Sequence, residues 1–164
     1  MTTCLPSPLG LVQITGSEAG VSAITCLNEP AVPNLFVEPM PEPVQRAFDQ
    51  LTEYFAGTRQ QFDFPIIPVG TTFQQLVWKA LLTVPFGTTM SYLTLSRQLG
   101  DEKAIRAVAA ANGRNPLAIV IPCHRVIGSN GSLTGYAGGL WRKQWLLEHE
   151  GALPGEKTGQ MRLF

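Results

Sequence analysis

The stretch of sequence that decides the fold is NPLAIVIPCHRVI, at residues 115–127. Its apolar run, residues 117–121, predicts a strand that is buried on both faces, and Pro122 ends that strand. Cys123 and His124 follow directly. Because neighbouring side chains of a strand point to opposite faces, these two can act together only across a turn or through a bridging water. Pro122 favours such a turn.

The Cys-His pair suggests an activated thiol. Thiolate is the nucleophilic form of cysteine, and a free thiol with a pKa of roughly 8.5 is mostly protonated at neutral pH. A neighbouring base removes that limit, and the base needs an orienting partner, for which Glu148 and Glu150 are available. The dipeptide by itself still favours a simpler interpretation, in which Cys123 packs in the core and His124 lies at the surface.

Short helices are predicted on the N-terminal side of this stretch. Thr72 and Gln75 have the spacing of a capping box at the start of the first helix. Ser91 caps a second helix that Gly100 closes, and Asp101 caps a third. The last two helices resemble a helix-turn-helix. The expected inward residues are Phe73, Leu76, Val77, Ala80, Leu81 and Val84 in the first helix and Ile105, Val108 and Ala109 in the third.

The outer face of the third helix carries Arg106 among the small residues Ala104, Ala107, Ala110 and Ala111. Small side chains let a helix approach a surface closely, and a single arginine can reach into a groove. Taken alone, the alanines favour the plainer interpretation that alanine is the best helix former.

Three further elements are expected on the C-terminal side. The Asn130-Gly131 pair, at the centre of residues 125–134, predicts a hairpin. Residues 135–139 form a glycine-rich loop, and residues 140–150 predict a helix.

The first 70 residues predict an α/β domain. Residues 9–15 and 21–27 have the pattern of two strands joined by a turn, and residues 28–43 carry five prolines and predict a loop. An amphipathic helix follows, and residues 61–70 predict an edge strand or a linker, which places a domain boundary near residue 70. The expected inward residues of that helix are Val44, Ala47, Phe48, Leu51 and Phe55.

Charge is divided unevenly along the 164 residues. The formal net charge is zero, which taken alone argues against a nucleic-acid partner. Residues 1–69, however, hold two Lys/Arg against seven Asp/Glu, a net charge of −5, and residues 70–164 hold ten against five, a net charge of +5. The asymmetry points to a polyanion partner for the second half.

Composition excludes several classes of protein. With 45% apolar and 15% charged residues, the chain is neither wholly disordered nor of low complexity. The longest apolar run, residues 117–122, is too short to span a bilayer, and the N-terminus lacks a secretory signal, so a cytoplasmic protein without a membrane partner is expected. Three widely spaced cysteines, with no C-x-x-C pair, predict neither disulfides nor a metal site.

Residues 121–126, IPCHRV, resemble the active-site signature of the O6-alkylguanine-DNA alkyltransferases, and residues 111–115, ANGRN, resemble the bacterial form of that family. The resemblance extends from about residue 72 to residue 151. It implies an α/β domain with an RNase H-like antiparallel sheet in residues 1–70, and a mainly α, winged helix-turn-helix-like domain in residues 71–151. The other matching pieces are SPLG at 7–10, FG at 86–87, SY at 91–92, RAV at 106–108, NP at 115–116, GYAGG at 135–139 and WLLEHEG at 145–151.

What the resemblance implies is DNA repair by irreversible transfer of the alkyl group from O6-alkylguanine, and from O4-alkylthymine, in double-stranded DNA to Cys123. Each molecule would act once, without a cofactor. In the family pattern Glu150 holds His124, and His124 deprotonates Cys123 through a water. Tyr92 would donate to guanine N3, and Asn115 would organise the active-site turn. The substrate-binding residues that the resemblance implies are Val126, Tyr136, Ala137, Gly138 and Lys143.

The family also flips the target nucleotide out of the duplex, through a helix-turn-helix in the minor groove. The resemblance implies that Arg106 fills the vacated position, so it favours the DNA-binding interpretation of the third helix. No metal is expected, because the zinc-bearing relatives use Cys and His ligands, whereas the first 70 residues contain no His and Cys4 and Cys26 do not form such a set. A monomer is expected as well. The other implied DNA-binding residues are Ala104, Ala107, Ala110 and Ser91.

The tail, residues 152–164, is predicted to be a flexible linker that ends in QMRLF. This peptide resembles the Q-L-x-L-F type by which bacterial repair and replication proteins bind the replicative sliding clamp, with Gln160, Leu163 and Phe164 as contacts. The alternative is that Leu163 and Phe164 pack on their own domain.

Two other functions are weighed against alkyl transfer. One is a helix-turn-helix protein that binds DNA without chemistry, as a sensor or regulator. The other is a cysteine hydrolase that uses Cys123 and His124, although nothing in the sequence marks an oxyanion hole.

Overall fold

The computed structural model describes residues 1–28 and 39–153. The chain divides into two compact units. The first consists of Met1–Val69 together with Pro116–Val120, and the second consists of Gly70–Asn115 and the chain from Ile121 onward. Among the residues described, no helix has the length and apolarity needed to cross a membrane.

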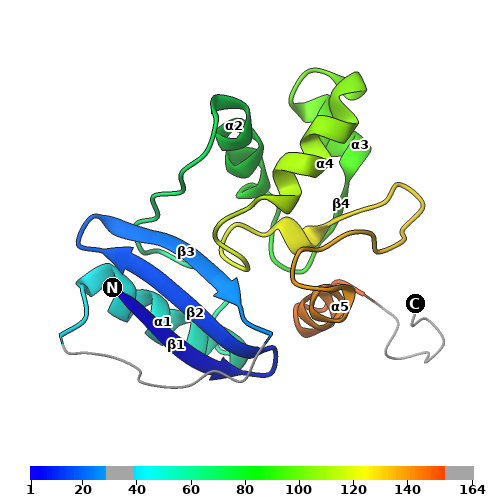
Figure 1. Ribbon diagram of the computed structural model, residues 1–164. Coiled ribbons are helices and arrows are strands. Elements are labelled where there is room, and N and C mark those ends of the chain that lie inside the picture. Colours follow the sequence, from blue (N-terminus) through cyan, green and yellow to red (C-terminus); the bar gives the residue numbers. More distant parts are fainter. Residues whose placement is uncertain (29–38, 154–164) are drawn as a thin grey trace. The chain divides into compact units, whose positions relative to one another are not determined.

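The first unit is built on a three-stranded antiparallel sheet with the order β1-β2-β3 (Figure 1). The strands are β1 (Thr2–Ser7), β2 (Gly10–Ser17) and β3 (Gly20–Cys26). Helix α1 (Glu42–Phe55) packs against one face of this sheet. The buried side chains between sheet and helix are Leu5, Val12, Ile14 and Ile24 from the strands and Val44, Ala47, Leu51 and Tyr54 from α1.

The predicted hairpin of β2 and β3 is confirmed, with Ser17 opposite Gly20 at the turn. Strand β1 is missing from the sequence prediction, because proline interrupts its short alternating pattern. A bulge separates Thr15 from Gly16. A Cβ atom at Gly16 would lie 2.7 Å from the carbonyl oxygen of Gly20, so the bulge requires glycine.

The strand predicted for residues 117–121 is wrong. Leu117 forms one parallel bridge with Ile24, and the chain then turns, with Ile119 at a φ of 74° and the Val120 amide donating to Ala118. Leu117, Ile119 and Ile121 are all buried. A run of apolar residues predicts that their side chains are buried, but it does not predict an extended backbone. Here a turn buries the same side chains. Residues 61–70, predicted as an edge strand or a linker, form one isolated bridge, between Val21 and Ile66, and no regular strand.

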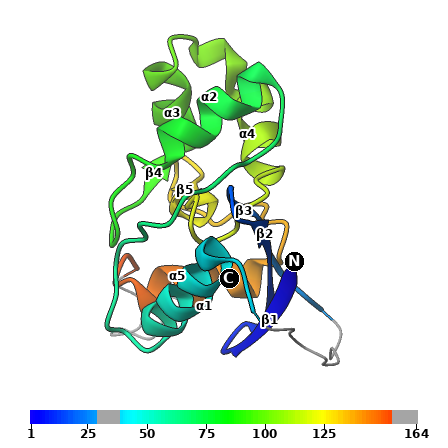
Figure 2. The ribbon, with the colours of Figure 1, turned by 90° about the vertical axis from the view of Figure 1, so that its left-hand side faces the viewer.

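The second unit is mainly helical. Helices α2 (Thr72–Leu81), α3 (Tyr92–Gln98) and α4 (Ile105–Gly113) lie together in both views (Figures 1 and 2). A 3-10 turn, Glu102–Ala104, leads into α4, and a second 3-10 turn, Cys123–Arg125, leads into β5 (Val126–Ile127). Strand β5 pairs in parallel with β4 (Met90–Ser91), and α5 (Leu140–His149) follows. The α/β domain followed by a mainly helical domain is thus as predicted.

The predicted capping box of α2 is wrong by one residue. The Thr71 hydroxyl accepts from the Gln74 amide, and the Gln74 side chain accepts from the Thr71 amide. Phe73 and Leu76, which were expected to point inward, are exposed and Trp78 is buried, whereas Val77, Leu81 and Val84 are buried as predicted. Two candidate caps one residue apart look alike in the sequence. Trp78 is held inward by a hydrogen bond that its Nε1 donates to the carbonyl oxygen of Ala111 at 2.9 Å.

Two smaller predictions in this unit also need correction. On α4, Ala109 is exposed and Ala111 is buried, the reverse of the expected arrangement. The hairpin expected in residues 125–134 is wrong, although its turn exists: the Gly131 amide donates to Gly128, but β5 pairs with β4. The caps of Ser91 and Asp101 are as predicted, with their side chains accepting from the amides of Thr94 and Lys103.

Candidate active site

Cys123 lies at the start of a tight turn. The turn expected after Pro122 is the 3-10 segment Cys123–Arg125, in which the Arg125 amide donates to Pro122. Asn115 braces it from the preceding segment, because its Nδ2 donates to the carbonyl oxygen of Ile121 at 2.7 Å. Cys123 itself is 7% exposed. A turn of this kind removes the strand geometry that would have sent Cys123 and His124 to opposite faces.

His124 is fully buried, and its Nε2 lies 2.9 Å from Oε2 of Glu150. Burial alone would raise the pKa of Glu150, but the hydrogen bonds and charges of His124 and Arg125 outweigh it and lower the pKa to about 2. Glu150 is therefore ionised and can only accept hydrogen bonds. It follows that the hydrogen of the imidazole is on Nε2.

Nδ1 of His124 is then the basic nitrogen of the site. Burial lowers the pKa of His124 and outweighs the opposing effect of Glu150, so the imidazole is neutral at pH 7. Nδ1 is buried and has no hydrogen-bond partner within the described part of the chain. A neutral imidazole with an available lone pair beside a cysteine is the arrangement of a general base.

Arg125 holds the far side of Glu150, a role that the sequence analysis did not assign. Its Nε donates to Oε1 at 2.8 Å and its Nη2 to Oε2 at 3.0 Å, while Nη1 donates to the carbonyl oxygen of Val84 at 2.7 Å. Both partners of this ion pair are buried. An arginine inside an otherwise apolar stretch is the signal that could have revealed it, because a buried cation needs an anion.

Lys143 joins two segments of the second unit. Its Nζ donates to the carbonyl oxygens of Val126 at 2.7 Å and of Thr134 at 2.9 Å. Burial lowers the pKa of Lys143 to about 8, and the negative charge of a Cys123 thiolate acts in the opposite direction. Electrostatic interaction is mutual, so a charged Lys143 favours the thiolate.

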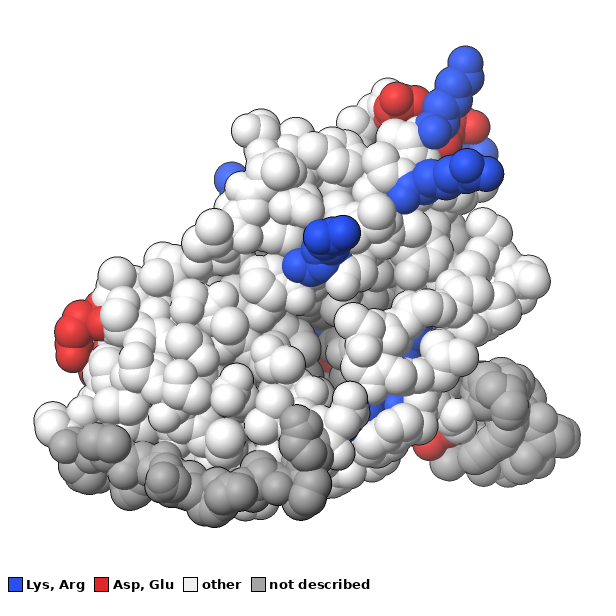
Figure 3. Space-filling model, in the orientation of Figure 1, with Lys and Arg blue, Asp and Glu red and all other residues white. Residues whose placement is uncertain are grey.

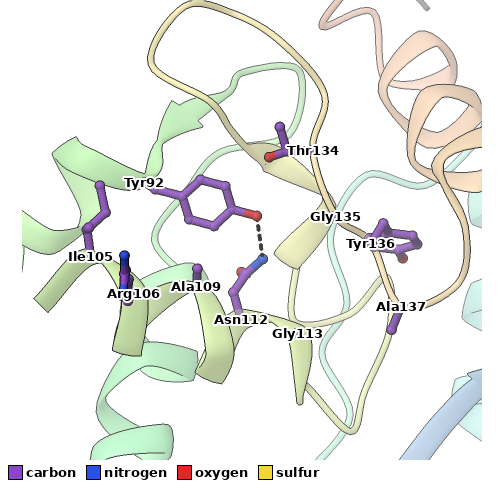
Figure 4. A pocket seen from close by; sticks show the side chains of 10 residues that line it. All are labelled: Tyr92, Ile105, Arg106, Ala109, Asn112, Gly113, Thr134, Gly135, Tyr136 and Ala137. Atoms are coloured by element: carbon purple, nitrogen blue, oxygen red, sulfur yellow. Dashed lines mark hydrogen bonds between the residues drawn. The ribbon is translucent and has the colours of Figure 1, made fainter.

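A pocket of about 560 Å³ opens beside this network, within the range of roughly 300–1,000 Å³ typical of small-molecule sites. Figure 4 shows Tyr92 on one side of it and Tyr136 with Ala137 on the other. Burial raises the pKa of Tyr92, so its hydroxyl keeps the proton. The lining residues are Tyr92, Ile105, Arg106, Ala109, Asn112, Gly113, Thr134, Gly135, Tyr136 and Ala137.

The structure separates the predicted site residues into groups. Cys123, His124, Glu150, Asn115, Lys143 and Val126 belong to the network around the turn. Tyr92, Arg106, Tyr136 and Ala137 line the pocket. Gly138 does not line it, and instead its carbonyl oxygen accepts from Arg142 at 2.8 Å. Ser91 caps α3. Asn112 and Ala109 line the pocket although no substrate role was predicted for them.

Basic side chains lie along α4. Figure 3 shows Lys and Arg side chains over the course of this helix, with acidic neighbours at one end. Arg106, Ala107 and Ala110 are exposed on α4, as are Lys103 in the turn before it and Arg114 directly after it, whereas Ala104 in that turn is half-buried. A helix with an exposed row of small and basic residues can lie close to a polyanion.

Comparison with known proteins gives the same name for both halves of the chain. Residues 72–152 match the family model of the 6-O-methylguanine DNA methyltransferase DNA-binding domain, and residues 1–68 match that of its ribonuclease-like domain. A methylated-DNA–protein-cysteine methyltransferase of Methanosarcina acetivorans is 45% identical over 149 residues, which cover 89% of this chain and 95% of that protein. One of Mycobacterium tuberculosis is 46% identical, with 89% of each chain covered.

Solved structures agree with the sequence comparison. An O6-methylguanine methyltransferase of Mycobacterium tuberculosis superposes with a TM-score of 0.80 at 43% identity, with 92% of each chain covered. A structure of Mycobacterium tuberculosis OGT in complex with DNA gives a TM-score of 0.81 at 45% identity, with 91% of each chain covered.

Proposed function

This chain belongs to the 6-O-methylguanine DNA methyltransferase family, and on that premise we propose that it repairs DNA by moving the alkyl group of O6-alkylguanine to Cys123. The observation that carries the assignment of residues is the buried array of Glu150, His124 and Cys123 beside a pocket. Ionised Glu150 keeps the hydrogen on Nε2 of His124, and Nδ1 is left to accept a proton.

The transfer is a single displacement at carbon. Nδ1 of His124 receives the thiol proton of Cys123, through a water in the family pattern. The thiolate sulfur then forms a bond to the alkyl carbon while the bond from that carbon to O6 breaks. The electron pair of that bond stays on the guanine, and a proton from the Tyr92 hydroxyl at N3 neutralises it. The thioether is stable, so the chain is consumed.

The test of this function is stoichiometry. The chain is incubated with an excess of duplex oligonucleotide that contains O6-methylguanine, and its intact mass is measured. We expect the mass to rise by one methylene per molecule, on the peptide that contains Cys123, with one methylguanine restored per chain. Repeated turnover, or DNA binding without any adduct, would contradict the proposal, and the second outcome would favour the sensor or regulator.

We propose further that α4 faces the DNA, with Arg106 in the space left by the flipped nucleotide and Ala104, Ala107, Ala110 and Ser91 near the backbone. Arg106 is exposed and also lines the pocket, which supports this role. Activity on O4-alkylthymine, the cytoplasmic location and the monomeric state stay predictions from the sequence.

Replacing Arg106 by alanine is expected to slow transfer from duplex DNA by about 10-fold to 100-fold, because unstacking a nucleotide costs a few kcal/mol. Transfer from the free base O6-methylguanine should be unchanged. Arg114→Ala is the matched control, since Arg114 is exposed near the end of α4 but does not line the pocket. It should weaken duplex binding in a salt-dependent way without changing the ratio of the two rates. An equal loss with both substrates in Arg106→Ala would contradict the proposed role.

A second partner is proposed for the tail. Gln160, Leu163 and Phe164 lie outside the described residues, so the proposal rests on the pattern QMRLF alone. Removing residues 160–164 is expected to abolish binding to the bacterial sliding clamp, measured by surface plasmon resonance, and to leave alkyl transfer to free oligonucleotide unchanged. Leu163→Ala with Phe164→Ala should reproduce the loss. Clamp binding that survives the deletion, or that the intact chain lacks, would refute the idea.

A further inference from the structure

We infer that Asn112 is a positioning residue that turns the hydroxyl hydrogen of Tyr92 toward the bound base and ties it to the backbone of Cys123. This inference rests on the proposed function. Asn112 lies on α4, lines the pocket, and is 3% exposed. Its Nδ2 lies 3.4 Å from the hydroxyl oxygen of Tyr92 and 3.4 Å from the carbonyl oxygen of Cys123. Figure 4 shows the first of these contacts reaching Tyr92 across the pocket.

The contact with Cys123 decides which way the amide of Asn112 points. A backbone carbonyl oxygen can only accept a hydrogen bond, so the amide nitrogen, not Oδ1, must face it. The same nitrogen carries a second hydrogen, which is directed at the hydroxyl of Tyr92. The orientation of the amide is therefore set by chemistry, whereas an isolated asparagine could be turned either way.

The direction of the Tyr92 hydrogen follows from this orientation. Because Asn112 donates to the hydroxyl oxygen, that hydroxyl cannot donate back to Asn112. Thr134 also lies beside Tyr92, but its hydroxyl both donates and accepts and therefore imposes no direction. When the Thr134 hydroxyl also donates to Tyr92, the hydrogen of Tyr92 is left for an acceptor in the pocket, such as guanine N3. Burial raises the pKa of Tyr92, which keeps that hydrogen in place until it is needed.

Packing alone does not account for an amide at this position. Oδ1 of Asn112 is buried and has no hydrogen-bond partner among the residues that the structure describes. A buried unsatisfied carbonyl is costly, and a leucine of similar size would avoid that cost. The two N–H groups are what a leucine lacks. They join the residue that attacks the alkyl carbon to the residue that stabilises the departing base.

The first experiment measures single-turnover transfer from duplex DNA with the full chain. Asn112→Leu is expected to slow transfer by about 10-fold to 100-fold, part of what general acid catalysis contributes. Asn112→Asp should lose at least as much, because a carboxylate would accept the Tyr92 hydrogen and turn it away from the pocket. Thr134→Val is the matched control, and its transfer rate should fall by less than that of Asn112→Leu. DNA affinity and the midpoint of thermal unfolding identify any variant that fails to fold, and Asn112→Ala is then used in its place.

The second experiment separates positioning from structure. In a Tyr92→Phe background, Asn112→Leu should cause no further loss, because there is no hydroxyl left to orient. With duplex that contains O6-methyl-3-deazaguanine, which lacks the N3 acceptor, Asn112→Leu should transfer the methyl group at the same rate as the unchanged chain. Two results would overturn the inference. One is that the rate losses of Tyr92→Phe and Asn112→Leu multiply in the double variant. The other is that Asn112→Leu slows transfer equally from O6-methylguanine and from O6-methyl-3-deazaguanine. An unchanged chain that forms no Cys123 adduct would overturn the proposed function instead, and the inference with it.

Discussion

Replacing Cys123 by alanine is expected to abolish alkyl transfer completely while duplex DNA still binds. No other group in the proposed mechanism can accept the alkyl carbon, so the loss is of the reaction and not of a fraction of its rate. Cys123→Ser tests the nucleophile more sharply, because it keeps a polar atom at the same place. A hydroxyl is far less acidic than a thiol, and His124 cannot ionise it to a useful degree. Serine should therefore also give no adduct.

The matched controls are the two other cysteines. Cys4 and Cys26 are partly exposed in the first unit, and Cys4→Ala and Cys26→Ala should each retain one alkyl group per chain. Intact mass, peptide mapping and fluorescence anisotropy with labelled duplex give the three readouts. A methyl group that moves to another residue in Cys123→Ala would show that Cys123 is not the acceptor.

Replacing Glu150 by glutamine is expected to have the second largest effect, on rate and stability together. Glutamine offers both a donor and an acceptor, so it no longer keeps the hydrogen on Nε2 of His124. The buried Arg125 also loses its anion. We expect transfer to slow by about 10²-fold to 10⁴-fold, and the free energy of unfolding at pH 7 to fall by about 3–5 kcal/mol.

The stability effect should depend on pH with a definite sign. The pKa of Glu150 is about 2 in the folded chain, against an ordinary value of 4.5. Its contribution is therefore fully present above about pH 4.5 and is lost as the pH falls toward 2. Urea unfolding should show a difference between the unchanged chain and Glu150→Gln that is largest at neutral pH and narrows below pH 4.5.

Two further variants separate the causes. Glu148→Gln is the control, because Glu148 lies on α5 two residues before Glu150 and accepts a hydrogen bond from Gln144 at 2.8 Å. It should change neither rate nor acid stability appreciably. Adding Arg125→Met to Glu150→Gln removes the unpaired cation and should restore stability but not rate. A pH-independent stability loss in Glu150→Gln would contradict the assigned pKa.

Prediction from the sequence was reliable where a feature is built from neighbouring residues, and weaker where it depends on which face of a helix is buried. The turn at Cys123, the hairpin of β2 and β3 and the caps of Ser91 and Asp101 were all predicted, because each rests on neighbouring residues. The capping box of α2 was misplaced by one residue, and the burial of Ala109 and Ala111 was reversed. Successive residues of a helix are rotated by about 100°, so a residue at the edge of the buried face, such as Leu76 or Ala109, can fall on either side of that edge, and the local pattern does not resolve which.

The sequence by itself determined the chemistry of this protein: a cysteine and a histidine in one turn, and a family signature around them. The residues alone left both Glu148 and Glu150 as possible partners for the base, and the family resemblance pointed to Glu150. The tertiary structure supplies the physical basis, because α5 ends where the Glu150 carboxylate meets both His124 and Arg125, a contact that no local pattern gives. Asn112 and Tyr92, 20 residues apart, were likewise joined by folding. Hydrogen bonds require positions within tenths of an ångström, and packing between distant elements sets those positions.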